Sequence, residues 1–217
     1  MTYALDKGAT IHLPVAGLRA VLRWTPTGVD GRRGGPDLDL SALLLGTGGR
    51  VRSEGDFVFY NQPRHPTGLV RRLSKRRDRE GLRDTVEAEL ARLDGSVTRI
   101  VLAASADGGF AAERSVPRLI LQDTAGTDRG TPLAVLPLTP APGETAVVCG
   151  ELVRVANGWE FHASGPGYPG GLVALAAAYG ITAAGDPTPT PQRPYGYPEP
   201  DPAFTLPPQG PQFLPRP

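Results

Sequence analysis

The stretch Leu18-Arg19-Ala20-Val21-Leu22-Arg23-Trp24 sets the class of the fold. Its first, third, fifth and seventh residues are apolar, and two of the three residues between them are arginines. Successive side chains of a β-strand point to opposite faces of a sheet. The alternation therefore predicts a half-buried strand with the leucines and the tryptophan facing a core.

Strand patterns recur on both sides of this stretch. Residues 86–90 alternate in the same way, and Asn157-Gly158 predicts a hairpin because both residues tolerate a positive φ. Short apolar runs bounded by Gly, Pro or Asp occupy residues 100–104, 118–121, 133–138, 146–155 and 159–163. Many short strands at turn spacing predict an all-β protein, a sandwich or barrel of antiparallel strands.

One helix is expected near the end of this β region. Residues 171–180 are rich in Ala and Leu and end on Gly180, which suits the position after a helix C-terminus. Residues 79–93 are a second helical candidate, but their apolar spacing fits a strand about as well.

The proline distribution places a domain boundary near residue 184. Twelve of the 24 prolines lie in residues 186–217, and proline cannot donate a backbone hydrogen bond. We therefore expect a β-domain over residues 1–184 and an extended, proline-rich tail over residues 185–217. The tail is either solvated, or its aromatics, among them Tyr195 and Tyr197, dock to a partner or to another copy of the chain.

Composition narrows the classes of function. A net charge of +1 gives no reason to expect nucleic acid or membrane as a partner of the whole chain. The single Cys149 excludes an internal disulfide and lies in an apolar run, where a buried role is expected. Residues 1–8 lack the apolar core of a signal peptide, and no apolar run approaches 18 residues. We expect a cytoplasmic protein without a membrane-spanning segment.

Several blocks, taken in order, resemble the TerD family of tellurium-resistance and stress proteins. They lie at Leu5-Asp6-Lys7-Gly8, Asp37-Leu38-Asp39-Leu40-Ser41-Ala42, Asp56-Phe57-Val58-Phe59-Tyr60-Asn61-Gln62, Gly150-Glu151-Leu152-Val153-Arg154, Trp159-Glu160-Phe161 and Gly165-Pro166-Gly167-Tyr168-Pro169-Gly170-Gly171-Leu172. The resemblance spans roughly residues 1–182. It implies a sandwich of two antiparallel sheets, a role in stress or tellurite response, and calcium bound by acidic loops at one end of the sandwich.

The candidate calcium ligands are Asp37, Asp39, Asp56 and Asn61. Residues i and i+2 of a strand point the same way, so Asp37 and Asp39 can converge on one hard cation. Asp56 and Asn61 bracket an expected strand over residues 57–60 and could add oxygen ligands from its two ends. Asp30 precedes the pair in a glycine-rich loop.

A basic stretch replaces the second acidic loop that the resemblance implies. Residues 71–84 hold seven Lys or Arg against three Asp or Glu, and nearby cations oppose calcium binding. Two interpretations follow: a single retained calcium site, or Asp37 and Asp39 paired with neighbouring arginines. We expect a basic loop that is either solvated or binds an acidic protein, with nucleic acid less favoured. Its candidate partner-binding residues are Arg71, Arg72, Lys75, Arg76 and Arg77.

No catalytic constellation emerges from the sequence. The three histidines share neither dyad nor metal-ligand spacing, and no nucleophile elbow, P-loop or CxxC motif is present. The sequence therefore predicts a non-enzymatic binding or scaffold module with a protein partner or self-association. The alternative is a calcium-responsive switch that retains one ion at Asp37 and Asp39.

Overall fold

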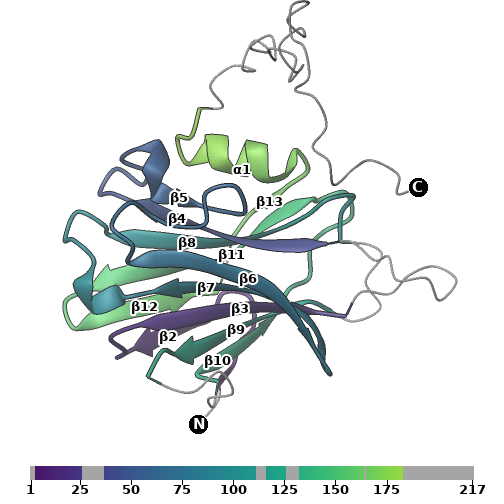
Figure 1. Cartoon of the computed structure of the whole chain (residues 1–217), viewed down its shortest axis with the longest axis horizontal. Coiled ribbons are helices and arrows are strands. Elements are labelled where there is room, and N and C mark those ends of the chain that lie inside the picture. The colour runs from purple at the N-terminus through teal and green to yellow at the C-terminus, as the bar shows by residue number, and fades with distance from the viewer. Residues whose placement is uncertain (1–2, 26–36, 111–115, 126–131, 164, 183–217) are drawn as a thin grey trace, which may run out of the picture. The chain divides into compact units, whose positions relative to one another are not determined.

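The computed structural model describes residues 3–25, 37–110, 116–125, 132–163 and 165–182. These residues form two packed sheets and one α-helix (Figure 1). The compact unit runs from Met1 to Ala183. The expected proline-rich tail, with Tyr195 and Tyr197, lies outside the described residues, as does Asp30, so the boundary at residue 184 stays a prediction.

The first sheet has six strands in the order β1-β10-β9-β3-β7-β6. Their bounds are β1 Tyr3–Ala4, β10 Ala134–Pro137, β9 Arg118–Asp123, β3 Leu18–Trp24, β7 Gly81–Ala88 and β6 Val70–Asp78. One edge departs from the antiparallel pattern, because β1 pairs with β10 in parallel. Residues 79–93, the second helical candidate, contain no α-helix. They form the turn of a hairpin, the strand β7 and a short 3-10 turn, η3 (Leu90–Arg92).

The second sheet has the strand order β2-β12-β11-β8-β4-β5, with β13 pairing β11. Its strands are β2 Thr10–Leu13, β12 Gly158–His162, β11 Ala146–Val155, β8 Arg99–Ala106, β4 Leu38–Leu45, β5 Phe57–Val58 and β13 Gly167–Tyr168. β11 and β12 form the expected hairpin, but Gly158, with φ +126°, already opens β12, and the turn lies at residues 156–157.

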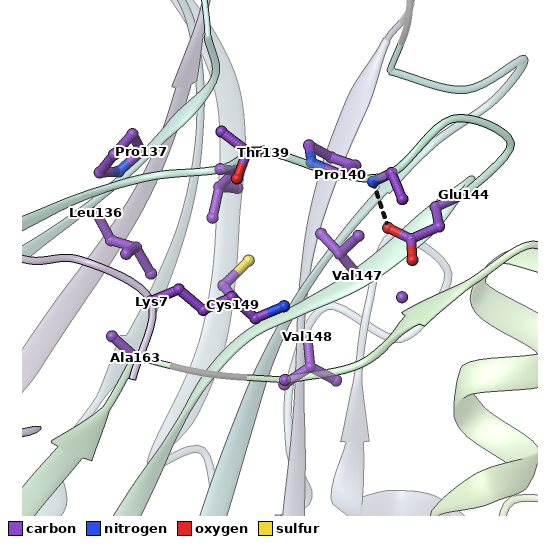
Figure 2. Close-up of a pocket in the computed structure, with 14 residues that line it drawn as sticks. Lys7, Leu136, Pro137, Thr139, Pro140, Glu144, Val147, Val148, Cys149 and Ala163 are labelled. Carbon is purple, nitrogen blue, oxygen red and sulfur yellow. Dashed lines mark hydrogen bonds between the residues drawn. The ribbon is translucent and has the colours of Figure 1, made fainter. Parts of the chain in front are cut away.

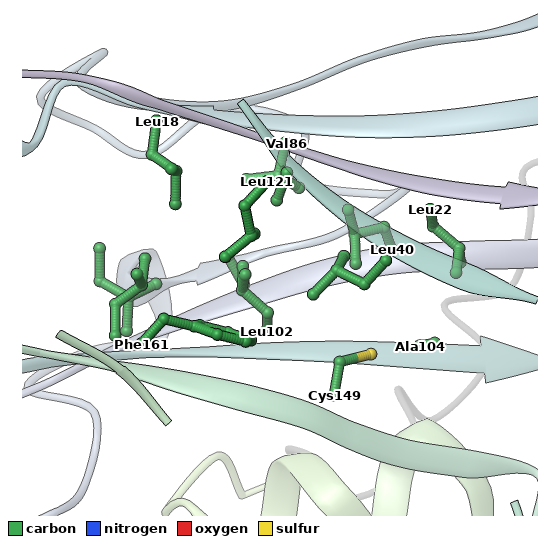
Figure 3. Close-up of a cluster of buried hydrophobic side chains, with 14 of the residues drawn as sticks. Leu18, Leu22, Leu40, Val86, Leu102, Ala104, Leu121, Cys149 and Phe161 are labelled. Atoms are coloured by element: carbon green, nitrogen blue, oxygen red, sulfur yellow. The ribbon is translucent and has the colours of Figure 1, made fainter. Parts of the chain in front are cut away.

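The main core lies between the sheets and follows the predicted alternation. Leu18 and Leu22 of β3 and Leu121 of β9 face Leu102 of β8 and Phe161 of β12 (Figure 3). All five side chains are 2% exposed or less. Burial of this apolar surface makes the largest favourable contribution to the stability of the sandwich. The predicted β-sandwich is therefore confirmed.

A second, smaller cluster lies on the outer face of the seven-stranded sheet. The helix α1 (Gly171–Ala178) packs there, with Leu175 and Ala176 against Val101 and Val148 (Figure 1). The predicted C-terminal helix is confirmed at this position. No helix in the described part of the chain is long and apolar enough to cross a membrane.

Candidate functional site

The predicted acidic pair lies at the start of β4, and its oxygens are already bonded to cations. The Lys75 ammonium lies 2.6 Å from an Asp37 oxygen and 3.0 Å from an Asp39 oxygen. Arg72 donates to the same Asp39 oxygen at 2.6 Å. The two carboxylates do converge, as the i, i+2 spacing predicted, but they converge on Lys75. The expected partners of this pair were arginines, and a lysine holds Asp37.

Asp84 of β7, which was not among the candidate residues, joins this cluster to the core. Its side chain is 0% exposed and accepts hydrogen bonds from Arg72 at 2.9 Å and from the backbone N–H of Leu40 at 2.8 Å. Leu40 belongs to β4 in the other sheet, so this carboxylate links the two sheets. A sequence signal was present, because Asp84 lies in the same alternation as the inward-facing Val86.

The basic stretch is a β-hairpin, so its description as a loop was wrong. β6 and β7 pair from Val70–Ala88 to Asp78–Gly81, with an irregularity between Leu73 and Arg76. Backbone pairing with β7, whose residues 84–88 are buried, draws this charged segment into a strand. β6 forms one edge of its sheet, where positive side chains oppose edge-to-edge aggregation.

The hairpin divides the five predicted partner-binding residues into two groups. Arg71 bonds Glu87 at 2.8 Å, and Arg72 and Lys75 hold the acidic cluster described above. Arg76 and Arg77 are exposed, and neither forms an ion pair with any described residue. These last two are the side chains of the five that have no acidic partner among the described residues.

Asp56 lies elsewhere and holds a local structure together. The strand after it, β5, has two residues instead of the expected four, and it pairs Phe57 with Leu43. This register places Asp56 roughly 15 Å along β4 from Asp39. Asp56 is 1% exposed, and Arg52 and His65 bond its oxygens at 2.6 and 2.9 Å.

Three further residues of this segment, His65, Gln62 and Asn61, either make local hydrogen bonds or are exposed. His65 holds Asp56 through Nε2, while its Nδ1 lies 2.7 Å from the Thr67 hydroxyl. Gln62 donates to the carbonyls of Glu54 and Phe57. Asn61 is exposed and bonds neither Asp37 nor Asp39. The structure therefore does not bring Asp56 and Asn61 together with the acidic pair.

The described residues do not fit a calcium ion as they are arranged. Calcium takes six to eight oxygen ligands, and several carboxylates normally supply them. No group of three or more His, Cys, Asp or Glu side chains in the described ranges is placed to hold a metal. At the acidic pair, two carboxylates face two cationic side chains, so an ion entering there would have to displace Lys75.

A small pocket of about 130 Å³ lies beside Cys149 (Figure 2). Lys7, Leu136 and Val147 line it, and Glu144 accepts a hydrogen bond from the Ala141 backbone N–H at its edge. Burial raises the pKa of the Cys149 thiol to about 12. The thiol is therefore protonated at neutral pH and is not a nucleophile.

Cys149 is expected to resist thiol reagents in the folded protein. At pH 8, a thiol with a pKa of about 12 is ionised in about one molecule in ten thousand. Incubation with a disulfide reagent at pH 8 should leave Cys149 unmodified, whereas the chain in 6 M guanidinium reacts completely. Rapid modification without denaturant would contradict the buried placement.

Comparison with known proteins agrees with this architecture. The TerD domain model matches residues 1–179. The chain is 32% identical over 194 residues to the tellurium resistance protein TerD of an Alcaligenes species, covering 85% of this chain and 100% of the relative. It is 29% identical over 191 residues to general stress protein 16U of Bacillus subtilis (strain 168), covering 83% of this chain and 98% of that one.

A solved structure shows the same fold. The crystal structure of a telluride resistance protein (TerD) homologue from Streptomyces coelicolor A3(2) superposes with a TM-score of 0.56 at 20% identity. It covers 75% of this chain and 95% of that one. The ordered sequence blocks, the two sheets and these matches agree, and the chain belongs to the TerD domain family.

Proposed function

We propose that this chain is a non-enzymatic binding or scaffold module of the bacterial stress response, in which tellurite resistance is one setting. The names of its relatives, tellurium resistance proteins and a general stress protein, support the setting. The exposed Arg76 and Arg77 at the free edge of the sheet support binding of an acidic protein partner. The cytoplasm remains the expected compartment.

The state of the reactive groups supports a binding role over catalysis. Cys149 is buried and protonated, His65 is held by Asp56 and Thr67, and His162 lies 3.2 Å from Glu160 on an ordinary strand. Among the described residues, these groups do not converge on a shared pocket with a base and a nucleophile within reach of each other.

The observation that carries the proposal is the occupation of Asp37 and Asp39 by Lys75 and Arg72. These contacts order the acidic end from within the chain. A lysine ammonium between two carboxylates removes the repulsion that otherwise favours a cation between them. In this module, partner binding needs no calcium.

The test of this proposal is recovery of a partner by the tagged full-length chain from its native cells, with calcium and with a calcium chelator. We expect the same protein partner in both conditions. Its loss in Arg76→Glu/Arg77→Glu, with retention in the charge-matched variant Arg50→Glu/Arg64→Glu, would assign it to the hairpin. Recovery of no reproducible partner by the unmodified chain would contradict the proposal.

The alternative is a calcium-responsive switch, and one observation favours it. Asp37, Asp39 and Asp107 line the same surface depression, together with Ser105 and the glycine that opens α1. If Lys75 moved away, these oxygens would be the nearest ligands for an entering ion.

Removal of Lys75 separates the two functions. We expect no heat of calcium binding to the unmodified chain at millimolar calcium, and a weak isotherm for Lys75→Ala, because the competing ammonium is gone. Isothermal titration calorimetry is the measurement. A micromolar isotherm for the unmodified chain that disappears in Asp37→Asn/Asp39→Asn would instead establish the switch.

A further inference from the structure

Four arginines form one row across the outer face of the six-stranded sheet. The strand register pairs Arg76 of β6 with Arg83 of β7, Arg83 with Arg23 of β3, and Arg23 with Arg118 of β9. Directly paired residues lie on the same face of a sheet, and neighbouring strands are about 4.8 Å apart. This arginine row therefore spans about 14 Å, at right angles to the strands.

A second row, with four apolar residues and one threonine, runs parallel to the arginine row. On β7, β3 and β9 this row lies two residues from the arginine row, and on β6 the irregularity lies between the two rows. Leu73, Thr85, Val21, Ile120 and Val135 are successive partners in the same register. The four apolar residues belong to neither buried hydrophobic cluster. Leu73, Ile120 and Val135 are partly exposed, whereas Thr85 and Val21 between them are 7% and 3% exposed. This apolar row therefore reaches solvent on both sides of a buried pair.

A third row lies on the far side of the apolar row. It contains Arg71, Glu87, Arg19 and Gln122, again in direct register. Arg19 and Arg71 both bond Glu87, at 2.8 Å each. One carboxylate therefore serves two guanidinium groups in this mixed row.

Two arginines of this face have no acidic partner among the described residues. Arg23 bonds Asp78 and Glu80, each at 2.9 Å. Arg76 and Arg118 are exposed, and neither forms an ion pair with a described residue. They lie at the two ends of the arginine row.

We propose that this face binds an acidic amphipathic helix of a protein partner, lying across the strands along the apolar row. The proposal rests on the binding function proposed above and names its partner class. The two outer rows are four residues apart, about 13 Å, and a helix with its side chains is about 10–12 Å wide. Apolar side chains of the helix contact Leu73 and Ile120, while glutamates on its two flanks reach the arginine row and the mixed row.

The dimensions also set the length of the partner segment. The apolar row crosses five strands, from β6 to β10, which is about 19 Å. About 13 residues of α-helix span this distance. The only α-helix in the described residues, α1, packs on the other sheet, so it does not cover this face (Figure 1).

The apolar row decides between a protein and a nucleic acid. Phosphates would meet the arginines, but nucleic-acid binding faces place aromatic side chains among their cations to stack on bases. Here the apolar row, with its one threonine, separates the two rows that contain arginines, and it contains no aromatic ring. An amphipathic helix uses both features.

The test uses a synthetic 14-residue peptide with leucines on one face and glutamates on both flanks, titrated into the full-length chain by fluorescence anisotropy. We expect Arg76→Glu/Arg118→Glu to weaken binding about tenfold. Arg50→Glu/Arg99→Glu makes the same change in net charge away from the six-stranded sheet, and should weaken binding less than twofold. Ile120→Thr should weaken binding about threefold by shortening the apolar row.

Two further probes complete the test. The same peptide with lysines in place of the glutamates should not bind. Equal weakening by both arginine pairs, tighter binding of a 16-base-pair DNA duplex, or no peptide binding at millimolar concentration would each overturn the assignment. A native partner that is still recovered by Arg76→Glu/Arg118→Glu would overturn this face alone. Failure of the unmodified chain to recover any partner overturns the binding function itself.

Discussion

Replacing Asp84 with alanine is expected to lower the free energy of unfolding by about 3–5 kcal/mol. The carboxylate is fully buried and accepts hydrogen bonds from Arg72 and from the Leu40 backbone N–H. Alanine would leave the Leu40 N–H without its acceptor in the gap between the sheets, and Arg72 would keep Asp39 as its acidic partner. An unmet buried donor carries the full cost of its desolvation. Urea denaturation, followed by tryptophan fluorescence, measures the loss.

A double replacement distinguishes the cost of unpaired groups from the value of the charges. Burial raises the pKa of the Asp84 carboxyl, although the hydrogen bonds from Leu40 and Arg72 oppose this rise. The site therefore does not favour the ionised form of Asp84 over its neutral form. Asp84→Leu/Arg72→Met removes both charges and keeps apolar volume, and should recover at least half of the loss. A loss below about 1 kcal/mol for Asp84→Ala would show that the sheets are not joined here.

The second large effect is expected at Asp56, where stability should depend on pH in the acid range. Burial alone would raise the pKa of Asp56, but hydrogen bonds from Arg52 and His65 outweigh it and lower the pKa to about 2. A carboxyl whose pKa is lower in the folded state stabilises that state when ionised. This contribution, about 2 kcal/mol, is present above about pH 4 and is lost as the pH falls towards 2.

Asp56→Asn tests the assignment. At pH 7 the variant should lose about 3 kcal/mol of unfolding free energy, because Arg52 loses its buried carboxylate partner. Between pH 4 and pH 2, its stability should fall about 2 kcal/mol less than that of the unmodified chain. Parallel pH profiles for the two proteins would show that Asp56 does not titrate in this window.

The segment around Asp56 shows how a family pattern can leave the role of a residue open. The sequence placed Asp56 among candidate calcium ligands, because an acidic residue beside a strand is a typical ligand. In the fold, Arg52 and His65 form hydrogen bonds with its oxygens, and Gln62 donates a hydrogen bond to the Phe57 carbonyl. Whether an acidic residue is free to bind an ion depends on contacts across space that neighbouring residues in the sequence do not specify.

Most of the strands, the sandwich class and the C-terminal helix could be predicted from the sequence alone, whereas β6 was expected as a loop. Alternation in residues such as Leu18 and Leu22 is a local property, because each side chain's face is fixed by its position along one strand. The same alternation marked Val86 and Ala88 as inward. The edge pairing of β1 with β10 could not be predicted in this way, since it joins segments more than 120 residues apart.

The charged side chains mark the limit of sequence reasoning about this protein. The sequence showed that acidic and basic groups are present, and that Asp37 and Asp39 share one side of a strand. Only the tertiary structure decided that Lys75 lies between them and that Arg76 and Arg118 fall in one row. Ion pairs and surface rows depend on distances between strands far apart in the chain, and those distances are set by how the strands pair and how the two sheets pack.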